Sequence, residues 1–403
     1  MTATAPVARA SRRWVLLVVV ALLGHALVAM RWPAAHALMI DLQVYRAGAE
    51  QVLAGRPLYD GGVLLDLPFV YPPFAAVAFL PLTVPPLWVV KAVWTAGTLL
   101  LLGYVVRRSL RSVGLPAGVA ATLGIVALAS WLDPVRTTLY LGQINVLVLA
   151  LVLGDVLGRP DSRWRGVGIG LAAALKLTPL LFIGYLLLTG RRRAAGTAAA
   201  VFGLAGAGAA LVAPGESRRY WWEGTFAAAG RISDVAATTN HSLNGLLARA
   251  MGEGPATRAC YLAGAAVLAA ATLLVAARLH RRGDELAGLT LCGLASAALA
   301  PFAWSHHWVW CVPLIVVLGQ RVVACPGSTR AGRTAAAGLA VVLLGTVAVI
   351  TALPGPGVGP IPRTGLISLA PDTYLVLFLL VLAVAAAEHR SGRPVDHRDV
   401  GAG

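Results

Sequence analysis

Long apolar runs recur along almost the whole of this 403-residue chain. A transmembrane helix needs about 20 mostly apolar residues, and the runs here are separated mainly by short, arginine-rich segments. Charged residues make up 12% of the chain, whereas soluble domains carry roughly 25%. The chain therefore has too little charge to cover an aqueous surface. The sequence predicts an all-α, polytopic integral membrane protein and excludes soluble, disordered and disulfide-scaffold proteins.

Ten of the apolar runs are predicted to be full membrane spans. They cover residues 14–30, 87–106, 117–132, 144–157, 194–212, 261–277, 286–303, 308–323, 334–352 and 373–387. A further apolar stretch at 166–189 is interrupted by Lys176-Leu-Thr-Pro179. A single span there would place every later arginine cluster on the wrong side of the membrane. We therefore expect a re-entrant hairpin of two short helices, giving twelve membrane helices, since broken helices are tolerated where they line a cavity.

The arginines indicate the orientation of these helices. In this arrangement 21 of the 31 arginines lie on one side of the membrane and 10 on the other, and arginine-rich loops face the cytoplasm. Both termini are then cytoplasmic, with tails at 1–13 and 389–403 around one membrane domain at 14–388. The external loops are 31–86, 133–143, 214–258, 304–307 and 354–372. An uncleaved first span is favoured over a cleaved signal peptide, which Ala35-His-Ala37 would also fit.

The net charge of +16 comes mainly from these arginine clusters between apolar runs. That distribution is typical of a multi-pass protein of the cell membrane, so we expect a lipid bilayer as partner and no nucleic acid. The four cysteines and the eight histidines show no spacing typical of metal ligands. We therefore expect neither a metal nor another cofactor.

The first external loop contains a candidate catalytic carboxylate, Asp41. Apolar residues at Leu42, Tyr45, Ala49, Val52 and Leu53 follow helical spacing, and Gly55 and Pro57 stop the helix. This pattern predicts a short amphipathic helix lying on the outer membrane surface, with Asp41 at its beginning. Asp41 is either the N-cap of that helix or a partly desolvated general base with a raised pKa.

Four polar side chains are further candidates: Lys176 inside a membrane segment, and Gln143, Asn145 and Tyr71 near the outer membrane boundary. Lys176 is flanked by apolar residues, and an ionisable residue inside a membrane segment is a functional candidate by default. Its alternative roles are snorkelling and a buried ion pair. Gln143 and Asn145 face either a polar cavity or a helix-packing interface, because buried amides need hydrogen-bond partners. Tyr71 precedes two prolines and is either a site residue or an aromatic membrane anchor.

Two later segments add polar groups on the same side. Trp304-Ser-His306-His307 joins two spans, and its histidines are able to act as acids or bases or, when protonated, to bind phosphate. Adjacent residues on a helix point about 100° apart, which favours a role for one of the two histidines. Asn240-His-Ser242 is either a substrate contact or ordinary polar loop structure.

Taken in order, these segments resemble glycosyltransferase family 87, the GT-C-type, polyprenol-phosphate-mannose-dependent α-(1→2)-mannosyltransferases of actinobacterial envelopes. The matching segments lie between about residues 38 and 310, and the last quarter matches only as apolar spans. They are Asp41-Leu-Gln-Val-Tyr45 with Gly55-Arg-Pro-Leu-Tyr59, Tyr71-Pro-Pro73, Gly142-Gln-Ile-Asn145, Lys176-Leu-Thr-Pro179, Asn240-His-Ser242 and Trp304-Ser-His-His307.

The resemblance implies a GT-C bundle with its active site on the extracytoplasmic face and an inverting transfer of mannose from polyprenyl-phosphate-mannose to a glycolipid of the phosphatidylinositol-mannoside or lipomannan pathway. It implies that Asp41 is the general base and that His306, His307 and Lys176 stabilise the leaving phosphate. The same motifs assign Tyr71, Gln143 and Asn145 to the donor, and Tyr45, Asn240, Ser242 and Trp304 to the substrates.

Two other functions fit much of the same pattern. An arabinofuranosyltransferase would use a polyprenyl-phosphate-arabinose donor, and the sequence separates the two sugars poorly. A transporter or flippase of lipid-linked sugars would place charges near the bilayer midplane and show pseudo-symmetric halves. No internal repeat is evident in the sequence, and the polar candidates other than Lys176 concentrate at one membrane face. These features favour the transferase.

Overall fold

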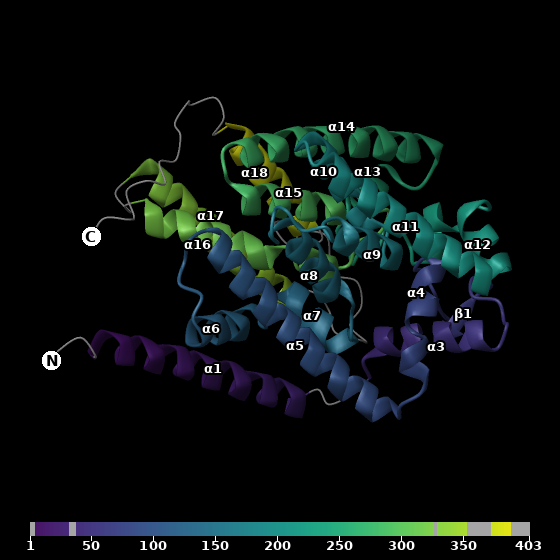
Figure 1. Cartoon of the computed structure of the whole chain (residues 1–403), viewed down its shortest axis with the longest axis horizontal. Helices are drawn as coiled ribbons and strands as arrows, with labels where there is room; N and C mark the ends of the chain where they lie inside the picture. The colour runs from purple at the N-terminus through teal and green to yellow at the C-terminus, as the bar shows by residue number, and fades with distance from the viewer. Residues whose placement is uncertain (1–4, 32–37, 326–328, 353–371, 388–403) are drawn as a thin grey trace.

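The computed structural model describes residues 5–31, 38–325, 329–352 and 372–387, and these residues fold into a helical bundle (Figure 1). The helices are α1 (Ala5–Arg31), α3 (Ile40–Leu53), α4 (Pro73–Ala78), α5 (Leu87–Ser112), α6 (Val119–Ala129), α7 (Asp133–Leu141), α8 (Asn145–Val156), α9 (Val167–Leu175), α10 (Leu181–Leu188), α11 (Arg192–Val212), α12 (Pro214–Trp221), α13 (Leu243–Met251), α14 (Pro255–Arg281), α15 (Glu285–Ala298), α16 (Cys311–Ala324), α17 (Arg330–Ala352) and α18 (Thr373–Ala387).

Short elements connect these helices. The 3-10 helices are η1 (Leu80–Thr83), η2 (Thr178–Leu180), η3 (Thr225–Ala227), η4 (Ala229–Arg231) and η5 (Ser305–Trp308). One small antiparallel hairpin pairs β1 (Gly62–Leu64) with β2 (Leu67–Pro68). The turn of this hairpin is formed by Leu65 and Asp66, both with positive φ.

Every apolar run predicted to be a span overlaps one of these helices, which confirms the all-α, apolar character of the chain. Among the described residues, four helices are long and apolar enough to cross a membrane, and a fifth span results if α6 and α7 count as one bent pair. The long four are Leu87–Ser112, Arg192–Val212, Pro255–Arg281 and Ser305–Ala324. Only 17% of the apolar windows of α11 and α14 is buried inside the protein, which suits helices that face lipid.

The chain reverses direction within the interrupted apolar stretch. Gly166, just before α9, lies against Ala194, and Gly170 lies against Ala198, one turn further along α11. Because both contacts advance in the same direction, α9 and α11 run parallel. The segment between them must then return to the start of α11, as the predicted hairpin requires. Lys176 lies at the point where α9 ends.

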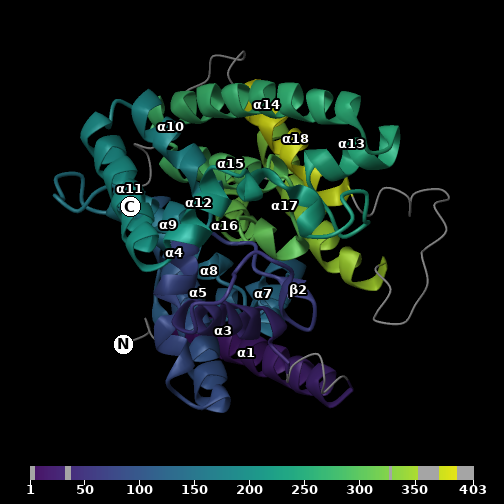
Figure 2. The ribbon, with the colours of Figure 1, turned by 90° about the vertical axis from the view of Figure 1, so that its right-hand side faces the viewer.

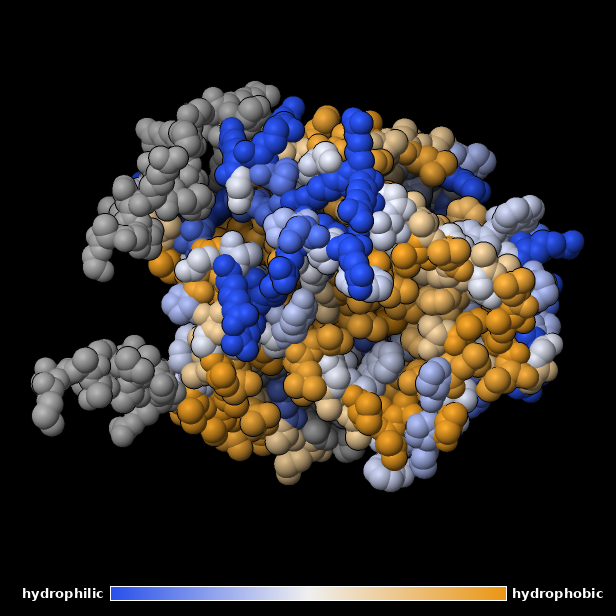
Figure 3. All heavy atoms as spheres, viewed as in Figure 1, coloured by the Kyte–Doolittle hydropathy of each residue, from blue (hydrophilic) through white to orange (hydrophobic). Residues whose placement is uncertain are grey.

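Several arginine-rich segments meet at one end of the bundle. Arg165 donates to the Val156 carbonyl, Arg191 forms a 2.6 Å ion pair with Glu285 at the start of α15, and Arg321 bonds Asp284 beside it. Figure 3 shows hydrophilic side chains gathered over the region of α10, α15 and the adjacent end of α5, with apolar side chains over much of the remaining face. These are segments for which the sequence predicts the cytoplasmic side.

The predicted external loops meet at the other end of the bundle. The backbone of Leu58 donates to Glu216, Thr137 bonds Ser305, and Arg249 pairs with Asp372 at 2.6 Å. Viewed from the right-hand side of Figure 1, the elements α3, α4, β2 and α12 lie on the face toward the viewer (Figure 2). Of the predicted external loop at 354–372, only Asp372 is described, and the predicted tail at 389–403 lies outside the described residues.

Helix α3 packs against its neighbouring elements through its apolar stripe. Leu42, Tyr45 and Ala49 are fully buried, as their helical spacing predicts. Gly48 lies against the ring of Phe69, where a Cβ atom would come within 2.4 Å of the ring. This close approach fixes α3 against the segment that leads into α4, and the contact of Gly142 with Leu42 places the beginning of α3 beside the end of α7.

Candidate functional site

Asp41 is the second residue of α3, and its carboxylate points toward the chain segment that follows α7. The N-cap position belongs to Met39, which has a left-handed backbone conformation (φ 43°). Asp41 Oδ2 instead accepts a 2.6 Å hydrogen bond from Gln143 Nε2. Asp41 is therefore not the N-cap of α3, and the residue is partly exposed.

Gln143 is the centre of the polar cluster. Its Oε1 atom accepts hydrogen bonds from the Tyr45 hydroxyl at 2.8 Å, from the Tyr71 hydroxyl at 3.2 Å and from Asn145 Nδ2 at 3.4 Å. Because the oxygen is used by these donors, the amide nitrogen is directed at Asp41. The preceding residue, Gly142, has φ 70° and lies so close to Leu42 that a Cβ atom would come within 2.6 Å of it. A glycine is therefore required there.

Lys176 completes the cluster from the hairpin. Its backbone is extended where α9 ends, its side chain is buried, and Nζ donates a 2.8 Å hydrogen bond to Asn145 Oδ1. Nζ also lies 5.6 Å from the centre of the Tyr71 ring, within the range of a cation–π contact. Hydrogen bonds thus link Asp41 to Lys176 through Gln143 and Asn145. The structure brings together six of the residues proposed for the site: Asp41, Tyr45, Tyr71, Gln143, Asn145 and Lys176.

Burial sets the protonation behaviour of the loop residues in the cluster. It raises the pKa of Asp41 to about 6, against smaller lowering effects of the Gln143 hydrogen bond and the Lys176 charge. Burial also raises the pKa of the Tyr45 and Tyr71 hydroxyls, so both remain protonated donors near neutral pH. Asp41 is thus ionised at pH 7 but able to take up a proton more readily than an ordinary aspartate.

The paired histidines lie close to the lysine. His306 is 3% exposed, and neither of its ring nitrogens has a hydrogen-bond partner among the described residues. Its ring lies nearly parallel to those of Trp304 and His307, with centroid distances of 5.6 and 4.8 Å, and the Trp304 and His307 rings are 6.0 Å apart. The His307 Nδ1 atom lies 3.2 Å from the Trp304 carbonyl oxygen. His307 lines one pocket together with Asn145, which accepts the hydrogen bond of Lys176.

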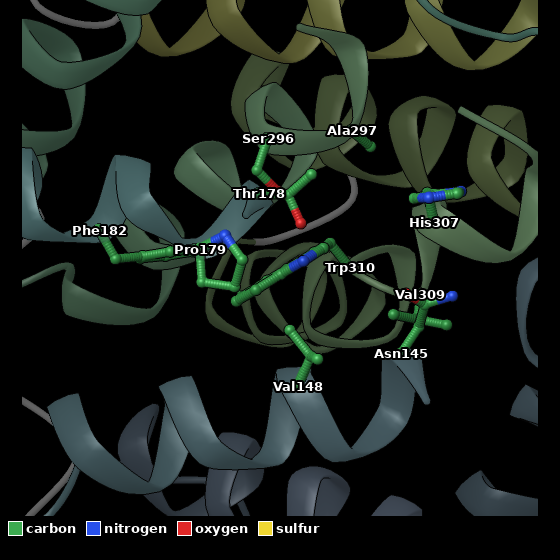
Figure 4. A pocket seen from close by; sticks show the side chains of 10 residues that line it. All are labelled: Asn145, Val148, Thr178, Pro179, Phe182, Ser296, Ala297, His307, Val309 and Trp310. Atoms are coloured by element: carbon green, nitrogen blue, oxygen red, sulfur yellow. The ribbon is translucent and has the colours of Figure 1, made fainter. Parts of the chain in front are cut away.

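A small pocket lies between the hairpin, α15 and the segment around η5. Asn145 and His307 line the same side of it, and Thr178 points inward from η2 (Figure 4). Ser296 of α15 and Trp310 complete much of the remaining wall. Thr178 and Ser296 were not among the residues proposed from the sequence. Thr178 could have been predicted, because it belongs to the same polar interruption of the hairpin as Lys176. Ser296 lies in an apolar run, and nothing in the sequence distinguishes it as a site residue.

Asn240 and Ser242 serve the local fold. The Asn240 Oδ1 atom accepts hydrogen bonds from the Ser242 hydroxyl at 2.8 Å and from the Ala303 backbone amide at 3.1 Å. Ser242 is the N-cap of α13 and accepts from the Gly245 amide. Both side chains are fully buried. They join the long external loop to the segment that leads to the histidines.

The other carboxylates of the first external loop lie outside the polar cluster. Glu50 pairs with Arg46 at 3.0 Å, Asp60 forms a 2.6 Å ion pair with Arg219, and Asp66 lies exposed in the β1–β2 turn. Asp41 is therefore the carboxylate of this loop that contacts Gln143. The geometry provides a carboxylate and a buried ammonium joined by hydrogen bonds through Gln143 and Asn145, and a pocket that Asn145 and His307 line. This combination suits removal of a proton on one side and stabilisation of an anionic phosphate on the other.

Known proteins similar to this chain come from mycobacteria. Over 402 residues, 96% of this chain and 90% of the relative, it is 35% identical to a polyprenol-phosphate-mannose-dependent alpha-(1-2)-phosphatidylinositol pentamannoside mannosyltransferase of Mycobacterium tuberculosis. Over 299 residues, 70% of each chain, it is 36% identical to a polyprenol-phosphate-mannose-dependent alpha-(1-2)-phosphatidylinositol mannoside mannosyltransferase of the same species. A protein of the latter description from Mycolicibacterium smegmatis is 37% identical over 312 residues, 69% of each chain.

No solved structure matches this chain. The sequence profile of glycosyltransferase family 87 matches residues 69–303. This range contains Tyr71, Gln143, Asn145 and Lys176 of the cluster, and the alignment with the first of these relatives extends over nearly the entire chain. With more than half of its length matched by the profile, the chain belongs to glycosyltransferase family 87.

Proposed function

We propose that this protein transfers mannose from polyprenyl-phosphate-mannose to a phosphatidylinositol-mannoside glycolipid, forms an α-(1→2) linkage with inversion, and uses Asp41 as general base. The observation that carries the proposal is the hydrogen-bonded connection from Asp41 through Gln143 and Asn145 to Lys176. It holds a proton acceptor and a cation in one cluster beside a pocket. The names of the relatives support mannose as the sugar and a phosphatidylinositol mannoside as the acceptor.

The proposed reaction is a single displacement at the anomeric carbon of the donor. A hydroxyl oxygen of the acceptor forms a bond to C1 of mannose while the bond from C1 to the phosphate oxygen breaks. The hydroxyl proton passes to the carboxylate of Asp41, and polyprenyl phosphate leaves with the bonding electrons. With its pKa raised to about 6, Asp41 is a stronger base than an ordinary aspartate while it remains ionised at neutral pH.

The leaving phosphate is proposed to bind on the lysine side of the cluster. The Lys176 ammonium supplies a charge-assisted donor, and His306 and His307 supply ring nitrogens from the neighbouring segment. Neutral His306 offers one N–H group to a phosphate oxygen, because neither of its ring nitrogens has a partner among the described residues, whereas His307 gives its Nδ1–H to the Trp304 carbonyl and needs a second proton to donate from Nε2. Asn145 begins α8, so free backbone N–H groups at this helix start add to the positive potential.

A second, apolar pocket, which includes Ala174 at the end of α9, suits the prenyl chain of the donor. It is lined by residues of α4, α9, α11 and α12, among them Phe74, Ala174, Phe202, Gly206, Ala209 and Trp221. Ala174 is two residues before Lys176, and the prolines that follow Tyr71 also line this pocket. In polyprenyl-phosphate-mannose the chain is attached directly to the phosphate, so an apolar surface must begin next to the phosphate site. The acyl chains of a phosphatidylinositol mannoside are separated from its sugar hydroxyls by glycerol, phosphate and inositol.

The proposal places this site on the extracytoplasmic face of the cell membrane. It includes a single membrane domain at 14–388 with ten full spans and one re-entrant hairpin, and cytoplasmic tails at 1–13 and 389–403. Two observations support it: predicted external segments contact one another at one end of the bundle, and arginine-rich segments meet at the other. The parallel course of α9 and α11 supports the hairpin.

Reconstitution with defined donors tests the proposal. The purified full chain in lipid vesicles is given polyprenyl-phosphate-mannose or polyprenyl-phosphate-arabinose, together with a phosphatidylinositol-mannoside acceptor. We expect transfer from the mannose donor alone, with a product that an α-(1→2)-specific mannosidase trims. Transfer of arabinose alone would contradict the choice of sugar. Movement of the intact donor between leaflets without transfer would instead identify a flippase.

A further inference from the structure

We propose that His25, in the first apolar helix, is a positioning residue that holds Gln143 against Asp41 by fixing the bend between α6 and α7. The inference rests on the proposed function only in taking Asp41 as the base. His25 lies in α1, distant in sequence from every residue of the polar cluster. Its side chain contacts α7, the helix that ends directly before Gly142 and Gln143.

His25 bonds both sides of the bend. The axes of α6 and α7 meet at 83°, with three residues between the two helices. His25 Nε2 lies 2.8 Å from the Ser130 hydroxyl in this break, and Nδ1 lies 3.2 Å from the Tyr140 hydroxyl on α7. The imidazole also stacks on Trp131, with ring centroids 4.5 Å apart. One side chain thus contacts the break and the end of α7 at the same time.

The hydrogen bonds define which nitrogen of His25 carries the proton. The Ser130 hydroxyl donates its single proton to the Ala127 carbonyl at 2.7 Å, so its oxygen accepts from His25 Nε2–H. His25 Nδ1 is then the acceptor for the Tyr140 hydroxyl. A neutral imidazole therefore satisfies both neighbours, and a side chain without two polar atoms in this arrangement leaves both contacts unmade.

The packing of α1 on α6 brings the imidazole to this position (Figure 1). Gly24 lies against the Trp131 ring, where a Cβ atom would come within 2.5 Å of it. Polar side chains that bond across helices within a membrane are a recurrent means of fixing helix positions. A polar, ionisable side chain in an apolar membrane helix costs free energy unless its polar atoms form hydrogen bonds. For His25, the α6–α7 bend provides the hydrogen-bond partners.

The last turn of α7 connects the residue that His25 contacts, Tyr140, to Gln143 in the site. Tyr140 is three residues before Gln143, and the Gln143 backbone amide bonds the Thr138 carbonyl at 2.9 Å. Gly142 packs against Leu42 in the first turn of α3, next to Asp41. A displacement of the α7 end therefore moves Gln143 relative to the carboxylate. The 2.6 Å hydrogen bond between them depends on that position.

The test measures transfer kinetics of the full chain in vesicles, with the mannose donor and phosphatidylinositol-mannoside acceptor. His25→Phe keeps a ring to stack on Trp131 and removes both hydrogen bonds. We expect kcat to fall by roughly 3- to 30-fold, the range typical of indirect coupling, with the donor KM within about twofold. His25→Gln, which keeps one donor and one acceptor, should recover part of the rate.

The double variant His25→Phe with Gln143→Ala separates positioning from general damage. If His25 acts through Gln143, the rate loss of the double variant equals that of Gln143→Ala alone, whereas independent effects multiply. The control is Trp14→Leu, which loosens α1 on α6 at Gly124, away from α7, and should leave kcat unchanged. Multiplying losses, or a loss of the same size in Trp14→Leu, would overturn the inference.

A readout without substrates keeps this test separate from the proposed function. Hydrogen–deuterium exchange of peptides covering 138–146 should be faster in His25→Phe than in wild type and unchanged in Trp14→Leu. If His25→Phe does not fold, Tyr140→Phe removes only one hydroxyl and should show the same local increase in exchange. Unchanged exchange in Tyr140→Phe and in a folded His25→Phe would refute the positioning role, whatever sugar the enzyme transfers.

Discussion

The carboxylate of Asp41 and the side-chain amide of Gln143 are 2.6 Å apart, although 102 positions separate them in the chain. Tyr45 and Tyr71 hold the amide oxygen from the opposite side, so the nitrogen has one direction in which to donate. This relationship makes Asp41 an oriented carboxylate, as a general base must be. The carboxylate bonds Gln143, and the N-cap of α3 is Met39, so the position of Asp41 is not explained by helix capping.

Substitution of Asp41 by Asn is expected to abolish most transfer without loss of the fold. The amide retains an oxygen for the Gln143 hydrogen bond but cannot take up a proton, so we expect a rate loss on the order of 10²- to 10⁴-fold. Initial rates of mannose transfer by the purified variant measure this. Asp66→Asn, in the exposed β1–β2 turn, is the control and should retain the wild-type rate. A stable Asp41→Asn variant that transfers mannose at the wild-type rate would refute the assignment.

The raised pKa of Asp41 also predicts a pH dependence of the rate. The value of about 6 results from burial, which outweighs the Gln143 hydrogen bond and the Lys176 charge. Only the ionised carboxylate accepts the acceptor proton, so kcat/KM for the acceptor should fall tenfold per pH unit below about pH 6 and level off above it. A profile of initial rates from pH 4.5 to 8 tests this. A limb with its midpoint near pH 4 would indicate an unperturbed carboxylate.

The same pKa predicts the sign of a stability effect. The pKa of Asp41 is higher in the folded chain than its ordinary value of 3.8, so between about pH 4 and pH 6 the folded state binds more protons than the unfolded state. The contribution of Asp41 to the free energy of unfolding therefore decreases as pH rises through this window. At pH 7 Asp41→Asn should melt at the same temperature as wild type or higher, and any gain should disappear near pH 4. A lower melting temperature at pH 7 would contradict this.

Much of the local architecture of the site was predictable from residue order. The spacing of Leu42, Tyr45 and Ala49 predicted the helix that is observed as Ile40–Leu53, because helical periodicity is a local property. The charge of Lys176 and the ring of Pro179 likewise predicted the break in the apolar stretch. In both cases the residues that carry the signal are those that form the element.

The connections between distant segments were not predictable in this way. Gln143 was proposed as a donor contact, but its bonds to Asp41 and Tyr45 depend on how α3 packs on the end of α7, which no single segment specifies. His25 was not singled out at all, because one histidine in an apolar run gives no indication of its partner. Helix α7 was treated as loop, although Asp133-Pro134 is a usual helix beginning.

Asn240→Ala is expected to reduce stability more than catalysis. Its carbonyl oxygen accepts from Ser242 and from the Ala303 amide in a fully buried position, and unsatisfied buried groups cost about 1–3 kcal/mol. Chemical denaturation in detergent should show a loss of that size, with donor and acceptor KM within about twofold of wild type. Asn244→Ala, which loses one partly buried bond to the Pro301 carbonyl, is the milder control. A large rise in either KM would favour a substrate contact for Asn240.

Accessibility of single cysteines in intact cells tests the membrane orientation. In a background without the four native cysteines, a membrane-impermeant maleimide should label a cysteine placed at Asp66 in the β1–β2 turn. Cysteines at Arg192 and Arg281 should react only after the cells are opened, because both lie in the proposed cytoplasmic set. Labelling of position 192 from outside would contradict the re-entrant hairpin and the orientation of every later helix.

The last prediction concerns the donor phosphate. Lys176→Met keeps most of the side-chain length and removes the ammonium that donates to Asn145. A charge-assisted hydrogen bond contributes about 1.5–3 kcal/mol, so kcat/KM for the mannose donor should fall by roughly 10- to 100-fold, while the acceptor KM changes little. The other lysine of the chain offers a matched control, because Lys91→Met makes the same substitution on α5, outside the polar cluster. If both variants keep the donor kinetics of wild type, Lys176 has a structural role at the end of α9, and the phosphate must be bound by the histidines and the α8 helix start. If only Lys176→Met loses donor use, the ammonium lies at the leaving phosphate, opposite the carboxylate of Asp41.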